Sequence, residues 1–177
     1  MSTLKVDTIQ DTGGTSYNFI KQVVSTTKTD VYSESFSTIQ EGSNITGFSA
    51  SITPSSTSSK VLLTGFMSVG TSGTSEHSLG YRIYRGSTLI SVGDADGNRA
   101  RVTGGANFSK QGHRAPAVLA INHLDSPSTT SSVTYNVRFY QQYATSVTLY
   151  LNRGGHGENN AGRTRATSTI TAMEVAA

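Results

Sequence analysis

The feature that most constrains this chain is a strict alternation of apolar with small or polar side chains. Between residues 131 and 140 the apolar positions are Val133, Tyr135, Val137 and Phe139. A period of two is typical of a β-strand with one buried face and one solvated face. No segment of useful length has the period of a helix. The pattern predicts an all-β scaffold that binds or builds, and it disfavours an enzyme.

Strand-like segments continue along the chain, separated by turns rich in Ser, Gly, Asn and Pro about every 8–12 residues. We interpret the following as strand candidates: 19–26, 31–36, 45–52, 60–69, 79–85, 88–92, 99–102, 115–124, 133–140, 147–152 and 168–175. A succession of short strands with this spacing favours an antiparallel β-sandwich or jelly roll over a parallel α/β fold.

Several local features carry their own predictions. The most apolar segment, 60–69, is expected to be a central strand buried on both faces. Gly86 and Ser87 indicate a short hairpin between their flanking strands. Segment 104–114 is interpreted as a glycine-containing loop. The segments 133–140 and 147–152 are expected to pair with each other through a turn near 142–146.

The first residues form a segment separable from the rest. Leu4, Val6 and Ile9 alternate with polar residues, and a turn sequence follows at 11–14. We interpret residues 1–17 as an extended N-terminal arm, and residues 18–177 as the sandwich domain. An edge strand of the main sheet is the alternative for the arm.

Composition narrows the function classes. Only 14% of the 177 residues are charged, the net charge is +3, and the arginines are scattered, so nucleic-acid binding by charge is disfavoured. The chain has no cysteine, which excludes disulfides and thiolate metal sites. No apolar run reaches the length of a membrane span, and no signal peptide is visible. We expect a protein made in the cytoplasm without membrane insertion.

No arrangement of residues suggests catalysis or a cofactor. The four histidines lack zinc-site spacing, and no G-x-S-x-G nucleophile motif is present. Asp94 and Asp96 begin like a calcium loop, but Gly105 occupies the position where the bidentate Glu is needed. A turn is therefore the better interpretation. No catalytic residue, metal ligand or cofactor is predicted.

Four segments carry a resemblance to a known family. Residues 2–14 (STLKVDTIQDTGG) resemble the N-terminal segment of structural proteins from tailed bacteriophages, especially marine and cyanobacterial ones. Residues 52–63, 124–135 and 168–175 are similar to stretches of phage fibre-like jelly-roll domains. The resemblance implies a trimeric jelly roll, broadly of the C1q or tumour-necrosis-factor type, carried on the virion. No fibre shaft separates arm from domain, which favours a compact appendage or a decoration protein.

Surface loops supply the candidate contact residues. Tyrosines interleaved with arginines, and loops near 104–114 and 154–165, suit recognition of carbohydrate or protein. The candidates are Arg82, Tyr84, His113, Arg114, His156, Glu158, Asn159 and Arg163. The alternative is that the tyrosines pack in a trimer core and the arginines only solvate it.

Together these features predict a non-enzymatic phage virion protein of the tail-fibre or tail-appendage type. Its expected partners are itself, as a homotrimer, and phage tail or capsid proteins, with a host-surface glycan or protein as a further partner. A capsid decoration or head-fibre protein that stabilises the shell without binding a host is the alternative. A depolymerase, which needs a carboxylate pair in a groove, is disfavoured because the acids are few and mostly separated.

Overall fold

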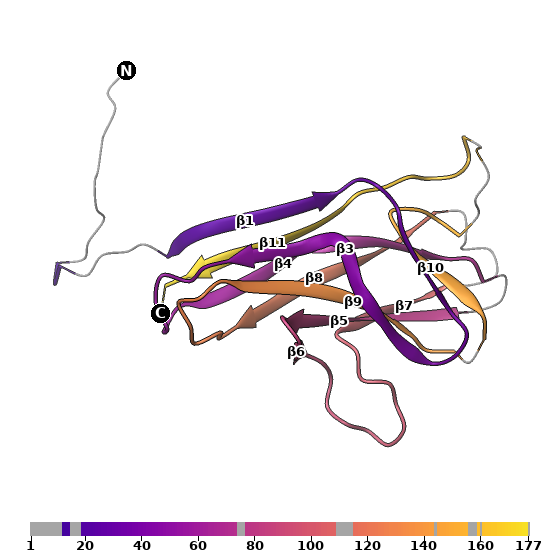
Figure 1. The fold of residues 1–177 in the computed structure, drawn as a ribbon. Coiled ribbons are helices and arrows are strands. Elements are labelled where there is room, and N and C mark those ends of the chain that lie inside the picture. Colours follow the sequence, from indigo (N-terminus) through magenta and orange to yellow (C-terminus); the bar gives the residue numbers. More distant parts are fainter. Residues whose placement is uncertain are drawn as a thin grey trace.

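The computed structural model describes residues 12–14, 19–73, 77–108, 115–143, 145–155, 159 and 161–176. The described residues form two antiparallel sheets packed face to face (Figure 1). One sheet contains β1 (Ile20–Lys28), β2 (Tyr32–Phe36), β4 (Lys60–Thr71), β8 (Ala117–Asp125), β10 (Val147–Leu151) and β11 (Ser168–Val175). The other contains β3 (Gln40–Ile52), β5 (His77–Arg85), β6 (Thr88–Ser91), β7 (Gly104–Phe108) and β9 (Val133–Gln141). The prediction of an all-β antiparallel sandwich is confirmed.

The strand pairing is nested. When β2, β6 and β10 are set aside, eight strands remain, and the first pairs with the last. The antiparallel pairs are β1 with β11, β3 with β9, β4 with β8, and β5 with β7. This order arises when one long hairpin is rolled up, and it defines a jelly roll.

The core lies between the two sheets and follows the alternation in the sequence. In β9, Tyr135, Val137 and Phe139 are fully buried, as their spacing predicts. They pack with side chains of the opposite sheet such as Leu63 and Leu149. Burying one large apolar side chain contributes about 1.5–3 kcal/mol. This layer is therefore the main favourable contribution to the free energy of folding.

The expectation that β4 is buried on both faces holds for its second half, residues 67–71, and is wrong for its first half. β4 is central, because it pairs with β8, β10 and β11. Its inward residues are buried, but the outward side chain of Phe66 is 39% exposed and Leu62 is only half-buried. Toward the other end of β4, Ser68 and Gly70 are buried on this face, and the backbone of Arg153 and Gly154 lies against Gly70.

The predicted loop at 104–114 begins with a strand, β7. Gly104 and Gly105 are poor strand formers, but here the backbone must approach β5 closely. A Cβ on Gly104 would lie 2.8 Å from the Tyr81 ring, and one on Gly105 would lie 2.7 Å from the carbonyl oxygen of Leu79. The glycines therefore allow the pairing. The predicted strand at 99–102 is a loop instead.

The predicted pairing of 133–140 with 147–152 is also wrong. β9 pairs with β3 and β5, whereas β10 crosses to the other sheet and pairs with β2 and β4. Both segments are strands, as predicted, but a period of two does not specify the partner.

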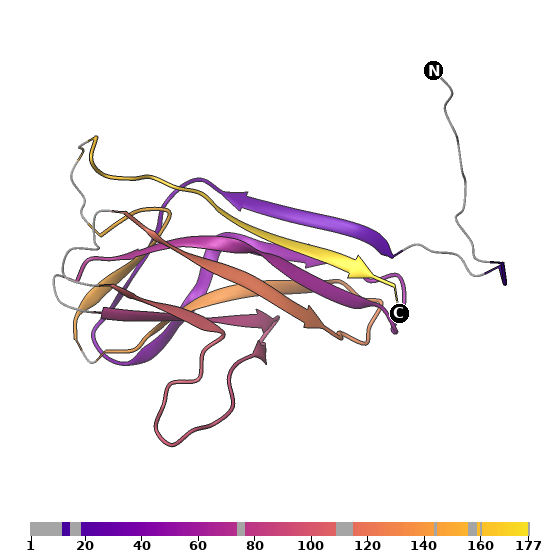
Figure 2. The ribbon, with the colours of Figure 1, turned by 180° about the vertical axis from the view of Figure 1, so that it is seen from behind.

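Both ends of the sandwich domain lie at the same edge of the fold (Figures 1 and 2). The backbone N–H of Ala176 donates to the carbonyl of Phe19 at 3.1 Å. Of the predicted arm, only residues 12–14 belong to the described part, so Leu4, Val6 and Ile9 lie outside it. Nowhere in the described ranges is there a helix long and apolar enough to cross a membrane.

Candidate functional site

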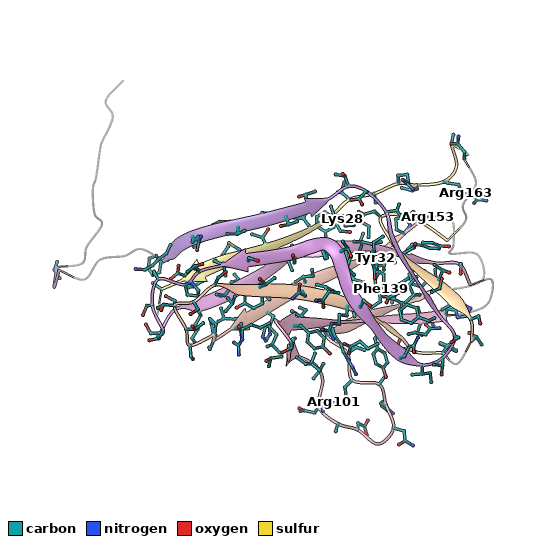
Figure 3. All side chains as sticks on the ribbon, in the orientation of Figure 1. Lys28, Tyr32, Arg101, Phe139, Arg153 and Arg163 are labelled. Atoms are coloured by element: carbon teal, nitrogen blue, oxygen red, sulfur yellow. The ribbon has the colours of Figure 1, made fainter. Side chains whose placement is uncertain are left out.

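The structure brings two of the predicted contact residues together. Arg82 and Tyr84 both project from the outer face of β5 into one polar cluster. Asn159 and Arg163 lie in the segment between β10 and β11, and Figure 3 shows Arg163 well away from Arg101, whose carbonyl oxygen accepts a hydrogen bond from Arg82. His113, Arg114, His156 and Glu158 lie outside the described residues.

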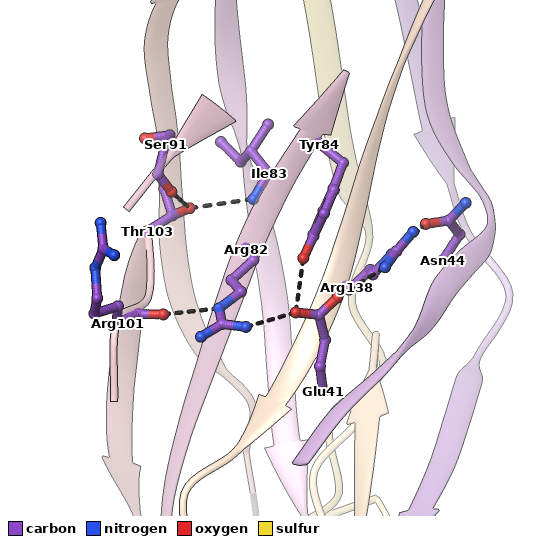
Figure 4. Close-up of polar contacts among 9 residues, drawn as sticks. All are labelled: Glu41, Asn44, Arg82, Ile83, Tyr84, Ser91, Arg101, Thr103 and Arg138. Carbon is purple, nitrogen blue, oxygen red and sulfur yellow. Dashed lines mark hydrogen bonds and ion pairs between the residues drawn. The ribbon is translucent and has the colours of Figure 1, made fainter. Parts of the chain in front are cut away.

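The cluster is centred on the carboxylate of Glu41 (Figure 4). Arg82 Nη1 donates to Glu41 Oε2 at 2.6 Å, and Arg138 Nη1 donates to Glu41 Oε1 at 2.8 Å. The Tyr84 hydroxyl donates to Oε2 at 2.7 Å. Three donors from two neighbouring strands therefore converge on a single acceptor.

The arginines are also stacked on tyrosines. Arg82 and Arg138 lie directly opposite each other in the β5–β9 register. The Arg82 guanidinium lies 4.2 Å from the ring centre of Tyr140, and that of Arg138 lies 4.0 Å from the ring centre of Tyr84. Each cation thus covers the ring of the neighbouring strand, which fixes the planes of both guanidinium groups.

An irregular edge strand delivers Glu41 to this position. β3 pairs with β9, but its register shifts between Glu41 and Asn44 and again between Asn44 and Ser49. Such irregularities redirect side chains at sheet edges. In the shifted segment Asn44 Oδ1 accepts a hydrogen bond of 2.7 Å from Arg138 Nε. The irregular register therefore gives Arg138 two acceptors, Glu41 Oε1 and Asn44 Oδ1.

The loop between β6 and β7 closes the other side of the cluster. Arg82 Nε donates to the carbonyl oxygen of Arg101 at 2.7 Å. The hydroxyl of Thr103 donates to the Ser91 carbonyl and accepts from the backbone N–H of Ile83. These bonds hold the loop against β5, so Arg82 is oriented from both of its sides.

The electrostatics of the cluster are those of a shared ion pair. Burial alone would raise the pKa of Glu41, but the hydrogen bonds from Tyr84, Arg82 and Arg138 outweigh it and lower the pKa below its ordinary value. Burial and the bond to Glu41 raise the pKa of Tyr84. Glu41 is therefore ionised at neutral pH, while Tyr84 remains a neutral donor.

A second polar cluster lies within the fold and was not predicted. Glu174 in β11 is 1% exposed, and its Oε1 accepts from Ser55 N, Ser55 Oγ and Ser59 Oγ at 2.6–2.8 Å. Nearby, Asp125 accepts from the Tyr135 hydroxyl and from Arg85. Both acids pair with the same residue of β4, Val61.

This second cluster unites three of the four segments that carry the phage resemblance. Residues 52–63 supply the serines, residues 168–175 supply Glu174, and residues 124–135 supply Asp125 and Tyr135. The only sequence signals for it are single acids at the end of apolar strands. These three segments therefore lie together in the structure, where they close one end of the sandwich.

A shallow groove of about 410 Å³ lies between β2, β4 and β10. None of its lining residues is ionisable, so it offers hydrogen bonds and a small apolar floor, but no acid–base chemistry. Its lining is Ser35, Phe36, Ser37, Ser72, Ser146, Val147 and Thr148.

Comparisons with known proteins give no family assignment. No family model matches the chain, and no curated protein matches its sequence. Among solved structures it is similar to a chain in the structure of infectious bursal disease virus, Gt strain, with 16% identity and a TM-score of 0.46 over 99% of this chain and 43% of that chain. For the Gx strain the values are 18%, 0.41, 99% and 42%. This chain spans less than half of either viral chain, and at these TM-scores the likeness does not define its role.

Proposed function

We propose that this chain is a non-enzymatic structural protein of a phage virion, a trimeric tail fibre or tail appendage. The arm, residues 1–17 with Leu4, Val6 and Ile9, anchors it, and the loops of the sandwich are presented to the host surface. The resemblance of residues 2–14 to tailed-phage structural proteins supports the virion role. The proposed self-association is supported by one structural observation, the apolar side chains exposed on the outer face of the β1–β11–β4–β8 sheet.

Apolar side chains form a row across this outer face. Val23, Met173, Leu62 and Leu124 lie opposite one another on successive strands. Val23 is 56% exposed and Leu124 is 50% exposed. Cross-strand neighbours of this kind make a continuous surface, so the row is a stripe of apolar area facing water.

The two rows on one side of this stripe add hydroxyl and amide groups but no charge, whereas the row on its other side contains the exposed Lys60, opposite Val175. Ser25 and Thr27 of β1 bond through their hydroxyls to Thr171 and Thr169 of β11, each at 2.9 Å. Phe66 of β4 lies in the same row as Thr27 and Thr169. The remaining members of these two rows are Thr64, Asn122 and Ala120. Val118, which is 67% exposed, extends the same face.

The three rows that begin with Val23, Ser25 and Thr27 contain no ionisable group, so they give a charged partner nothing to pair with. The chain itself supplies a matching uncharged surface, and soluble homo-oligomers bury such surfaces in closed symmetric assemblies. A trimer built on this face would cover the apolar stripe. It would also present three copies of each loop, which raises the avidity of weak contacts.

Two substitutions on this face test the self-association. Phe66→Asp and Val118→Asp each place a charge in the proposed interface, where an unpaired buried charge costs several kcal/mol. We expect both variants to sediment as monomers. Leu89→Asp is the matched control, because Leu89 is similarly exposed at 36% but belongs to β6 of the other sheet. Unchanged association of the two variants, or equal loss in the control, would refute the proposed interface.

Immunogold labelling of phage particles tests the location. Label confined to the tail is the expected result. Label spread over the capsid would overturn the tail assignment and favour the decoration protein, whose shell-stabilising role requires many copies and no host ligand.

A further inference from the structure

Hydroxyl side chains from three strand ends line the groove between β2, β4 and β10. They belong to Ser35, Ser37, Ser72, Ser146 and Thr148. The groove has a volume of about 410 Å³, within the range of about 300–1,000 Å³ that is typical of small-ligand sites. Because these side chains line one space, a single small ligand can contact several of them.

Strand pairing holds three of these hydroxyls in a row. Ser35 lies directly opposite Thr148 in the β2–β10 register, and their hydroxyl oxygens are 2.9 Å apart. Ser72 follows the end of β4. Its N–H donates to the Thr148 carbonyl and its Oγ accepts from the Thr148 N–H, both at 2.9 Å. The row is therefore in place before a ligand arrives, which reduces the ordering cost of binding.

These hydroxyls retain donors and acceptors for a ligand. A hydroxyl has one donor and two acceptor positions, and the bond between Ser35 and Thr148 uses one donor of the pair. Ser72 Oγ accepts one bond and keeps its O–H. Ser37 and Ser146 are exposed, and within the described part of the chain their hydroxyls make no hydrogen bond. A ligand in the groove therefore meets both donors and acceptors.

The groove offers these groups without charge, since none of its lining residues is ionisable. Glu34 of β2 lies on the other face of its strand, opposite the buried Leu149 of β10. Carboxylates and phosphates bind best to charged donors, and calcium binds to carboxylates. The lining therefore favours a neutral ligand with hydroxyls of its own.

The groove lies at the end of the sandwich away from the arm. The arm joins β1 at Ile20, which pairs with Val175, and Val175 pairs with Lys60 at the start of β4. The groove adjoins the other end of β4, beyond Thr71, and the 12 residues of this strand span about 36 Å. Figure 1 shows the start of β1 and β10 at opposite ends of the fold. A chain anchored by residues 1–17 presents this groove outward.

We propose that the groove between β2, β4 and β10 binds a neutral saccharide, whose hydroxyls donate to and accept from those of Ser72, Thr148 and their neighbours. Sugar hydroxyls combine both roles, as the lining does. A peptide is disfavoured because it gains affinity from apolar anchors in pockets. The apolar floor, Phe36 and Val147, is only 4% exposed at each residue and gives such an anchor little contact.

The inference gives a ligand class to the host contact of the proposed function and rests on that proposal for its role alone. Beside the groove the neighbour of β4 is β10 and not β11, so the site is separate from the apolar stripe. Saccharide binding by the isolated chain is independent of its mass and of its place on the particle. Failure of one proposal is therefore distinguishable from failure of the other.

The test is an NMR titration of the 177-residue chain with the methyl glycosides of D-glucose, D-galactose and N-acetyl-D-glucosamine. D-glucuronate, inorganic phosphate and glycerol are the comparison ligands, at constant ionic strength. We expect at least one neutral glycoside to shift the backbone amide signals of Ser72, Val147 and Thr148 saturably. No saturable shift with any of the three would overturn the site. Tighter binding of glucuronate or phosphate, or equal binding of glycerol, would overturn the neutral-saccharide assignment.

Two variants and a matched control make the test specific. Thr148→Val nearly keeps the shape of the side chain but removes a hydroxyl, and we expect it to weaken binding at least about threefold. Thr134→Val is the control, because Thr134 also bonds to a serine hydroxyl across a strand pair, that of Ser51 at 2.8 Å, but belongs to the other sheet. We expect its binding to be unchanged.

Ser37→Ala keeps the test decisive if Thr148→Val fails to fold. It removes an exposed hydroxyl that makes no hydrogen bond within the described residues, so we expect an intact fold and weaker binding. Equal losses in Thr148→Val and Thr134→Val would contradict the proposal, and so would unchanged binding in Ser37→Ala.

Discussion

Replacing Gly65 with alanine is expected to remove about 4 kcal/mol or more of folding free energy, because it combines overpacking with backbone strain. Gly65 lies in the central strand β4 with φ +151°. A Cβ there would lie 2.0 Å from the carbonyl oxygen of Thr169 in the paired strand β11. The neighbour is backbone and cannot rotate away, so one of the two strands must move.

Chemical denaturation followed by circular dichroism measures this loss. Gly93→Ala is the control, because Gly93 has no positive φ and nothing within 4 Å of the added Cβ. We expect the control to stay within about 0.5 kcal/mol of the wild type. If Gly65→Ala were as stable as Gly93→Ala, the close approach of β4 and β11 would be wrong.

Replacing Glu174 with alanine is expected to cost about 3 kcal/mol, since hydrogen bonds to a charged group contribute about 1.5–3 kcal/mol and a buried donor is left without an acceptor. Glu174 ties the loop before β4 to the last strand through Ser55 and Ser59. Ser59 is 2% exposed, so its hydroxyl would lose its partner away from water. Urea unfolding at neutral pH measures the difference.

The pH dependence of this variant gives a second signature. Burial alone would raise the pKa of Glu174, but the bonds from Ser55 and Ser59 outweigh it and lower the pKa below the ordinary value of 4.5. The stabilisation is therefore complete above pH 4.5 and is lost as the pH falls through the folded-state pKa. The gap between wild type and Glu174→Ala should shrink in acid, whereas Ser58→Ala, in the same exposed loop, should differ little from wild type at any pH. A gap that stays constant in acid would show that Glu174 does not act as a carboxylate.

Much of the fold was predictable because the position of a strand and its buried face are determined by residues that are neighbours in the sequence. The alternation around Tyr135 and the spacing of 168–175 each specify a strand and its buried face. The partner of a strand is not local: nothing near Val147 indicates that β10 crosses to the other sheet. β7 was missed because its glycines are poor strand formers in isolation and serve a close backbone approach that appears only in three dimensions.

The candidate site was predicted only in part for a similar reason. Arg82 and Tyr84 were identifiable as an alternating basic and aromatic pair on one strand. Their acceptor, Glu41, lies 41 residues away from Arg82 along the chain, on an irregular edge strand. An isolated acid between Gln and Gly carries no spacing signal, so its role depends on the register of β3 against β9. Glu174 is hidden in the same way, because a single acid in an apolar strand looks like a solvated residue.

The mass of the 177-residue chain in solution, measured by multi-angle light scattering, tests self-association through the β1–β11–β4–β8 face most directly. A trimer would have three times the monomer mass of 18.7 kDa, about 56 kDa. We predict that mass at micromolar concentration. A stable monomer that leaves Val23, Phe66, Val118 and Leu124 in water would contradict the proposed function.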